Sequence, residues 1–173
     1  TAGGEFSVTA SSSAEPITPT NIQIKKQSSY GSSDIDAVSI GNATMFVQRA
    51  KRKVREFVYN YDTDGFIAPD LTILAEHISD SGITEMSYQQ EPQSSLWCVR
   101  TDGILIGLTY ARNEQVVGWH RHIFGGVFGS GNAVVESVAT IPGDLNEDVT
   151  YVIVKRTING ATRRYVEYLQ PVD

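Results

Sequence analysis

The feature that most constrains this chain is a hairpin plan that occurs three times along the sequence. In each copy an apolar triplet runs into a polar, basic turn, and a second apolar run follows. The triplets are Met45-Phe46-Val47, Trp97-Cys98-Val99 and Val152-Ile153-Val154. Alternation of apolar and polar residues, rich in Val, Ile, Thr, Tyr and Phe, is typical of β-strands. The pattern therefore predicts an all-β protein built from antiparallel hairpins.

Turn residues and spacing extend this prediction from hairpins to larger units. Thr101-Asp102-Gly103 and Asn159-Gly160 are residues that favour tight hairpin turns. The matched residues Val47, Val99 and Val154 lie 52 and 55 positions apart. A period of roughly 50 residues, with three or four short strands in each unit, is typical of propeller blades.

We therefore predict a propeller-like array of antiparallel three- to four-stranded blades, forming a single domain over residues 1–173. The expected blade-like units are 35–66, 83–124 and 134–170, with a partial unit at 1–27. Propellers usually have about four or more blades. Either residues outside this sequence complete a ring, or the sheets form an open array. We favour the first and expect an internal or C-terminal fragment of a longer protein.

Two segments interrupt the strand pattern. Asp70 is a good N-cap, and the apolar residues that follow it have helical spacing; they are Leu71, Leu74, Ala75 and Ile78. This spacing predicts one short helix at about 71–79, packed on the rim of the array. Residues 125–131 are mostly glycine and serine, so we expect a flexible loop there.

Composition limits the classes of function. The net charge of -6 argues against general coating of nucleic acid, because phosphate binding needs clustered Lys and Arg. Cys98 is the only cysteine, which excludes an intramolecular disulfide and a four-cysteine zinc site. No apolar run approaches the roughly 18 residues of a membrane helix. We expect a protein without cofactor or membrane contact, assembled in a reducing cytoplasm.

Ten short segments spread over the chain share the character of one protein family. They are Thr1-Ala2-Gly3-Gly4-Glu5, Tyr30-Gly31-Ser32-Ser33, Gly41-Asn42-Ala43, Phe46-Val47-Gln48-Arg49, Lys53-Val54-Arg55-Glu56-Phe57, Ala68-Pro69-Asp70-Leu71-Thr72, Tyr88-Gln89-Gln90-Glu91-Pro92, Leu96-Trp97-Cys98-Val99-Arg100, Gly118-Trp119-His120-Arg121-His122 and Asn159-Gly160-Ala161-Thr162-Arg163-Arg164-Tyr165-Val166-Glu167. Together they resemble a tailed-phage or prophage family of large tail proteins, similar to the packaged-DNA stabilisation and tail-nozzle proteins of short-tailed phages.

The resemblance implies a β-propeller portion of a virion subunit, in a ring beneath the portal through which DNA is retained and later leaves. Its partners would be other phage structural subunits, with homo-oligomers formed by the full-length protein and non-specific proximity to DNA. The chain is shorter than the full-length family. An alternative is a tail module that binds a receptor or glycan. An enzyme such as a propeller glycosidase needs two carboxylates about 5–10 Å apart, whereas the acids here are scattered through turns.

Basic hairpin turns are the candidate binding residues. Equivalent turns of successive blades project to one side of a propeller, so these side chains would form a stripe for an acidic neighbour or for phosphate. The alternative is that they are ordinary solvated hairpin ends. The residues are Lys51, Arg52, Lys53 and Arg55 in the first unit, and Lys155, Arg156, Arg163 and Arg164 in the third.

Other candidate sites have simpler structural explanations. His120 and His122 share one face of a strand, but two imidazoles with a distant His77 make an incomplete metal site. Asp62-Thr63-Asp64-Gly65 resembles the start of a calcium loop, although a plain turn explains it better. Cys98 is expected to be a buried thiol. We expect core and inter-blade packing for the aromatic residues, which are Phe46, Trp97, Tyr110, Trp119, Tyr151 and Tyr168. No catalytic residue is predicted.

Overall fold

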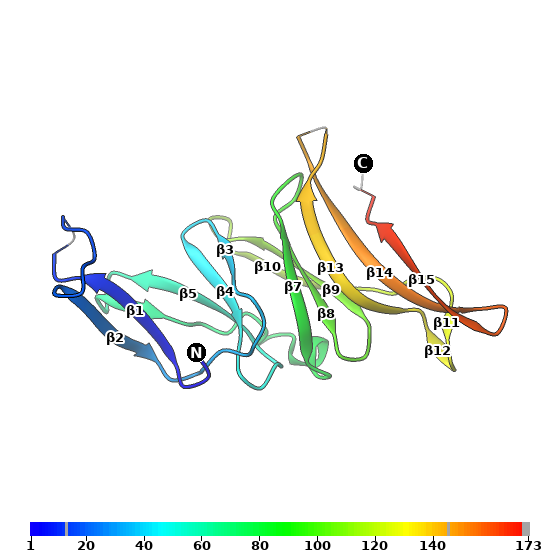
Figure 1. Ribbon diagram of the computed structural model, residues 1–173, viewed down its shortest axis with the longest axis horizontal. Helices are drawn as coiled ribbons and strands as arrows, with labels where there is room; N and C mark the ends of the chain where they lie inside the picture. The colour runs from blue at the N-terminus through cyan, green and yellow to red at the C-terminus, as the bar shows by residue number, and fades with distance from the viewer. Residues whose placement is uncertain (13, 145, 171–173) are drawn as a thin grey trace.

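The computed structural model describes residues 1–12, 14–144 and 146–170 as a row of small antiparallel sheets along the long axis of the molecule (Figure 1). The described part contains strands, turns and one short 3-10 helix, η1 (Glu76–Ser79). The all-β prediction is confirmed. The first sheets are formed by β1 (Glu5–Ala10) and β2 (Ile22–Ser28), and by β3 (Val38–Ile40), β4 (Ala43–Val47), β5 (Val54–Asn60) and β6 (Gly65–Ile67).

The remaining sheets repeat the same up-and-down connectivity. The central sheet contains β7 (Ile83–Gln89), β8 (Ser95–Arg100), β9 (Leu105–Ala111) and β10 (Val116–His122). A small hairpin of β11 (Val127–Phe128) and β12 (Gly131–Asn132) precedes the terminal sheet of β13 (Val134–Pro142), β14 (Asp148–Ile158) and β15 (Ala161–Tyr168). The tight turns form where expected, with Gly103, Asn159 and Gly160 in the left-handed region.

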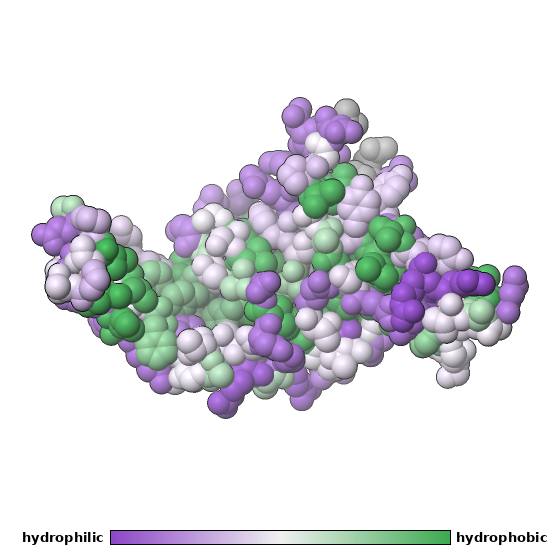
Figure 2. Space-filling view, viewed as in Figure 1, coloured by the Kyte–Doolittle hydropathy of each residue, from purple (hydrophilic) through white to green (hydrophobic). Residues whose placement is uncertain are grey.

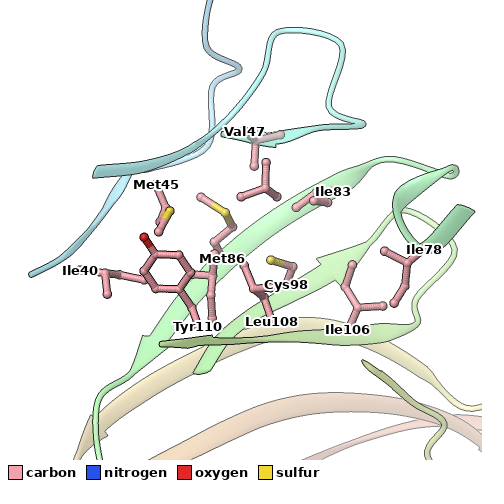
Figure 3. Close-up of a cluster of buried hydrophobic side chains, with 12 residues drawn as sticks. Ile40, Met45, Val47, Ile78, Ile83, Met86, Cys98, Ile106, Leu108 and Tyr110 are labelled. Carbon is pink, nitrogen blue, oxygen red and sulfur yellow. The ribbon is translucent and has the colours of Figure 1, made fainter. Parts of the chain in front are cut away.

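Two apolar cores hold the larger sheets face to face. The first lies between β3–β6 and the central sheet, where Met45 and Val47 point toward Met86 and Leu108 (Figure 3). The second lies between the central and terminal sheets and contains mainly valine, with Trp97 and Leu105. Because side chains alternate along a strand, Leu96 and Cys98 of β8 lie in the first core, whereas Trp97 and Val99 lie in the second. The middle strands of the central sheet are therefore covered on both faces.

The same hydrogen bond joins successive sheets at equivalent places. The N–H of Ile83, which begins β7, donates to the carbonyl oxygen of Lys51 in the β4–β5 turn (2.7 Å). The N–H of Val135, near the start of β13, donates to the carbonyl oxygen of Gly103 in the β8–β9 turn (2.8 Å). Each hairpin turn thus receives the first strand of the next sheet. The structure repeats at the level of whole sheets.

Side chains of the central sheet add a second link to β13. The N–H of Val138 donates to the Glu85 carboxylate (2.9 Å), and the N–H of Thr140 donates to the Ser87 hydroxyl oxygen (2.8 Å). The Ser137 hydroxyl donates to the other oxygen of Glu85 (3.2 Å). These bonds fix β13 against β7, so that the first strands of two successive sheets lie side by side (Figure 1).

The helix expected at 71–79 is wrong in extent and type. The N–H of Leu71 donates to the Val54 carbonyl (2.9 Å), and the Leu71 carbonyl accepts from Trp119 Nε1 (2.9 Å). These bonds hold the segment against strands, and only η1 becomes helical. Asp70 accepts from the Thr72 N–H (2.8 Å), as a turn residue rather than the cap of an α-helix. Leu74 is exposed instead of lying on a buried stripe.

Two further differences concern the expected loop at 125–131 and the alignment of the repeated triplets. The loop expected at 125–131 contains the β11–β12 hairpin, in which Val127 pairs with Asn132. The alignment of triplets also shifts by one residue in the third unit. Val47 and Val99 face the following sheet, whereas Val154 faces the preceding one. Ile153 is the residue of that triplet that faces away from the central sheet.

Among the described residues, no helix has the length and apolar character needed to cross a lipid bilayer. Residues 1–12, 14–144 and 146–170 form a set of small sheets stacked in sequence order, and these sheets do not close into the ring of a propeller.

Candidate functional site

The predicted basic residues of the first unit are largely engaged within the chain. Lys51 forms an ion pair with Asp34 (2.6 Å). Lys53 Nζ lies 2.8 Å from Asp70, and the Asp70 carboxylate and its hydrogen bond raise the pKa of this amine. The Arg55 side chain is buried, donates to the Ala68 carbonyl (2.6 Å) and stacks on the ring of Tyr30. Arg52 is exposed and makes no ion pair with the described residues.

The third unit shows a similar pattern. Glu136 binds Lys155 (2.7 Å) and Arg164 (2.5 Å), and these hydrogen bonds lower the pKa of its carboxyl to about 2. Arg156 pairs with Glu167 through both terminal nitrogens. Arg163 is exposed without an ion pair to any residue that the structure describes.

The two basic groups therefore do not form the continuous positive stripe that the sequence predicted. They lie on different sheets, with the β8–β9 turn between them in the chain, and no salt bridge in the described ranges joins one group to the other. Most of their charge is balanced by nearby carboxylates. Binding of an acidic partner by these turns remains a prediction, carried mainly by Arg52 and Arg163.

The outer face of the terminal sheet carries exposed apolar side chains. Along β14 the residues facing the central sheet are Val152 and Val154, which are buried. The opposite face carries Ile153, paired across the ladder with Val166, and Tyr151, paired with Tyr168. Val166 is 72% exposed and Tyr168 is 61% exposed. This surface is termed the outer face below and comprises Tyr151, Ile153, Val166 and Tyr168.

A second apolar face lies at the other end of the row, on the β1–β2 hairpin. Val8 pairs with Ile24, and both are exposed, as are Phe6 and Ile22 on the same face. Figure 2 shows hydrophobic surface at this end of the molecule and again over the terminal sheet. Contiguous apolar surface of this kind is characteristic of sites that contact another protein.

Sequence reasoning missed the outer face because it assigned Tyr151 and Tyr168 to packing. A signal was present in the run from Tyr151 to Val154, which is apolar at adjacent positions rather than at alternate ones. Strands with apolar residues on both faces are typically covered on both faces. The run Leu96–Val99 has the same character and is buried throughout. Of the other predicted packing aromatics, Phe46, Trp97 and Tyr110 are buried.

A small cavity lies beside Trp97, at one end of the second core. Trp97, His120 and His122 line it, together with Gln89, Gln93 and Gln170. Burial lowers the pKa of both imidazoles, and the neighbouring ring lowers that of His120 further. His77 lies on η1 and is exposed, away from this lining.

The remaining candidates have structural roles. Cys98 is fully buried in the first core, and burial raises the pKa of its thiol. Residues 61–64 form the β5–β6 turn, in which Tyr59 donates to Asp64 (2.5 Å). Within the described ranges, no three His, Cys, Asp or Glu side chains cluster as a metal site with three protein ligands would require.

Comparison with known proteins gives no further assignment. A scan against protein-family descriptions found no matching family, and a search of curated proteins found no matching sequence.

Proposed function

We propose that this chain is a non-enzymatic structural module of a tailed-phage or prophage virion, in the tail or the head-to-tail nozzle. It would act by stacking its sheets against those of neighbouring subunits around the path of DNA exit. Assembly would take place in the bacterial cytoplasm. The observation that carries the proposal is the outer face, where apolar side chains paired across β14 and β15 are exposed in the part of the chain that the structure describes.

The repeated links between sheets support a blade-like arrangement. The first strands of successive sheets, β3, β7 and β13, contact one another in order, as the innermost strands of propeller blades do. The Lys51 and Gly103 carbonyls each receive the next sheet. The β14–β15 turn at Asn159-Gly160 is the third member of this series. A further sheet on the outer face would continue the array, from this polypeptide or from another subunit.

The resemblance of the ten sequence segments to phage tail-nozzle proteins supports the location in a virion. It also agrees with the chemistry of the surfaces, because subunit contacts need apolar faces and no acid–base pair. The net charge of -6 favours protein neighbours over tight binding of DNA. Arg52 and Arg163 remain the basic residues best placed for weak, non-specific contact with phosphate.

Light scattering over a dilution series tests the contact surface. The mass of the wild-type chain should rise with concentration, whereas V166K should stay monomeric because a charge on the outer face cannot be buried without cost. I73K is the matched control, since Ile73 is similarly exposed, at 65%, but lies near η1. A V166K variant that associates as well as wild type would refute the role of the outer face.

Mass spectrometry of purified particles tests the location. Virions of the phage or prophage that encodes this sequence should contain the chain in a fixed copy number. Its absence from particles that contain the other tail proteins would overturn the virion assignment and leave the assembly surface without that context.

One observation favours the alternative of a glycan- or receptor-binding tail module. Tyr61 is 89% exposed at the β5–β6 turn, and its ring meets that of Tyr59 edge to face at 5.1 Å. Exposed tyrosines can stack on sugar rings. Glycan-array binding that Y61A abolishes would favour this alternative over the structural proposal.

A further inference from the structure

The second core ends in a row of three residues that lie side by side across the central sheet. Gly107 on β9 pairs with Trp97 on β8 and with His120 on β10. A Cβ atom at position 107 would overlap Cε1 of the His120 ring. The ring therefore lies across bare backbone and meets Trp97 edge to face, with centroids 5.5 Å apart. Glycine at this position leaves the space that the imidazole occupies beside the β9 backbone.

His122, two residues along the same strand, completes the arrangement. Its Nε2 atom lies 2.6 Å from Nδ1 of His120, and the ring centroids are 4.9 Å apart. Trp97 also contacts the His122 ring, at 5.0 Å. The Thr109 hydroxyl lies 3.3 Å from the remote nitrogen of His120. This hydroxyl fixes the ring so that the other nitrogen points at His122, as outer hydrogen-bond partners orient metal-binding histidines.

We propose that His120 and His122 form a two-histidine site for a divalent transition-metal ion such as Ni²⁺, Cu²⁺ or Zn²⁺. Imidazole nitrogen suits these ions, and the two nitrogens lie 2.6 Å apart on rings that both line a cavity of about 290 Å³. The cavity leaves room for water molecules to complete the coordination. The site is distinct from the outer face and does not depend on the proposed assembly role.

The alternative is a direct N–H···N hydrogen bond between the two rings. Metal–nitrogen bonds of about 2.0–2.1 Å would place the two nitrogens roughly 3 Å apart. The rings must therefore separate by a few tenths of an ångström when an ion enters. Both side chains are only partly buried, so this adjustment does not require the core to move.

The expected site is open and exchangeable rather than structural. Structural zinc sites usually have about four protein ligands, whereas the described residues supply two here. The Gln93 and Gln170 side chains also line the cavity, and an amide oxygen would be a weak additional ligand. Occupancy would therefore follow the concentration of the free ion.

Isothermal titration calorimetry with NiCl₂ and with ZnCl₂ tests the proposal. Wild type should bind one ion. H122N should bind at least roughly tenfold more weakly, because the second imidazole acts intramolecularly at high effective concentration. H77N is the matched control and should bind as wild type does. Binding unchanged in H122N, or lost equally in H77N, would overturn the site.

Two spectroscopic readouts separate coordination from damage to the fold. Ni²⁺ should quench the fluorescence of Trp97, and W97F should lose that quenching while it still binds the ion. Zn²⁺ should shift the ¹⁵N resonances of His120 Nδ1 and His122 Nε2. If neither resonance moves at saturating Zn²⁺, the hydrogen-bonded pair is the whole function of these residues.

Discussion

The central sheet and the terminal sheet have the same construction but different surroundings. Both are antiparallel meanders with apolar residues on the two sides of their middle strands. In the central sheet both sides are covered, and Val99 is only 1% exposed. In the terminal sheet one side is covered by the second core and the other is open. The apolar residues of the outer face are therefore not required by the fold of the chain alone.

The energetic consequence of this difference can be estimated. Full burial of a side chain such as valine or isoleucine contributes about 1.5–3 kcal/mol. The central sheet realises this contribution on both sides, whereas the terminal sheet leaves part of it unused at Ile153 and Val166. A covering sheet would gain that free energy, less the cost of association. The comparison explains why the outer face suits a subunit contact.

Truncation of a core side chain in the central sheet should lower the free energy of unfolding far more than truncation of a side chain on the outer face. Leu108 is completely buried in the first core, so L108A should lower the free energy of unfolding by about 2–5 kcal/mol. V166A on the outer face should change it by less than about 0.5 kcal/mol. Urea unfolding followed by tryptophan fluorescence measures both. Equal losses would mean that the outer face is already covered.

An intermediate effect is expected at the junction between the sheets. E85A removes the acceptor of the Val138 N–H and the Ser137 hydroxyl, and leaving such donors unpaired costs about 1–3 kcal/mol. E85Q keeps an acceptor oxygen and should lose less. The same urea experiment ranks the two variants. If E85A is as stable as wild type, the link between β7 and β13 is not needed for the stacking.

The smallest effect concerns the ion pairs beside the outer face. E136Q should cost less than about 1 kcal/mol at pH 7, because Glu136 pairs with Lys155 and Arg164 near the surface. The pKa of this carboxyl is lower in the folded chain, about 2, than its ordinary value of 4.5. The folded state therefore binds fewer protons, so the contribution is complete above pH 4.5 and declines as the pH falls toward 2.

Unfolding of wild type and E136Q at pH 7 and at pH 3 checks this sign. The difference in stability between the two proteins should shrink at the lower pH. A difference that stays constant or grows would show that the ion pairs do not stabilise the folded sheet.

Local sequence patterns predicted the strands well because their causes are local. Alternation from Ile83 to Tyr88 and the turn residues at Asn159-Gly160 led directly to β7 and to the β14–β15 hairpin. The segment after Asp70 failed for the opposite reason. Its apolar spacing is helical, but the backbone of Leu71 is hydrogen-bonded to Val54 and Trp119, and these bonds hold the segment against the strands. Such long-range bonds leave no periodic signal in the sequence.

The site residues were less predictable for a related reason. A charged turn has the same local sequence whether or not its charge is balanced by a carboxylate. The carboxylates that pair with Lys51 and Lys155 belong to Asp34 and Glu136, which are well separated from these lysines along the chain. The pairing of His120 with His122 was visible as alternation on one strand. The approach of the His120 ring to Trp97 depends on Gly107, which lies on another strand and was not predictable from that alternation.

Hydroxyl-radical footprinting at low and high protein concentration shows whether the outer face forms the contact between chains. Tyr168 on the outer face and Tyr61 at the β5–β6 turn are both exposed in the single chain, so their oxidation rates can be compared within one sample. Oxidation of Tyr168 should fall as the chain associates, while that of Tyr61 stays constant. Association that leaves Tyr168 fully reactive would rule out the outer face as the contact surface, because the contact would then lie elsewhere on the molecule.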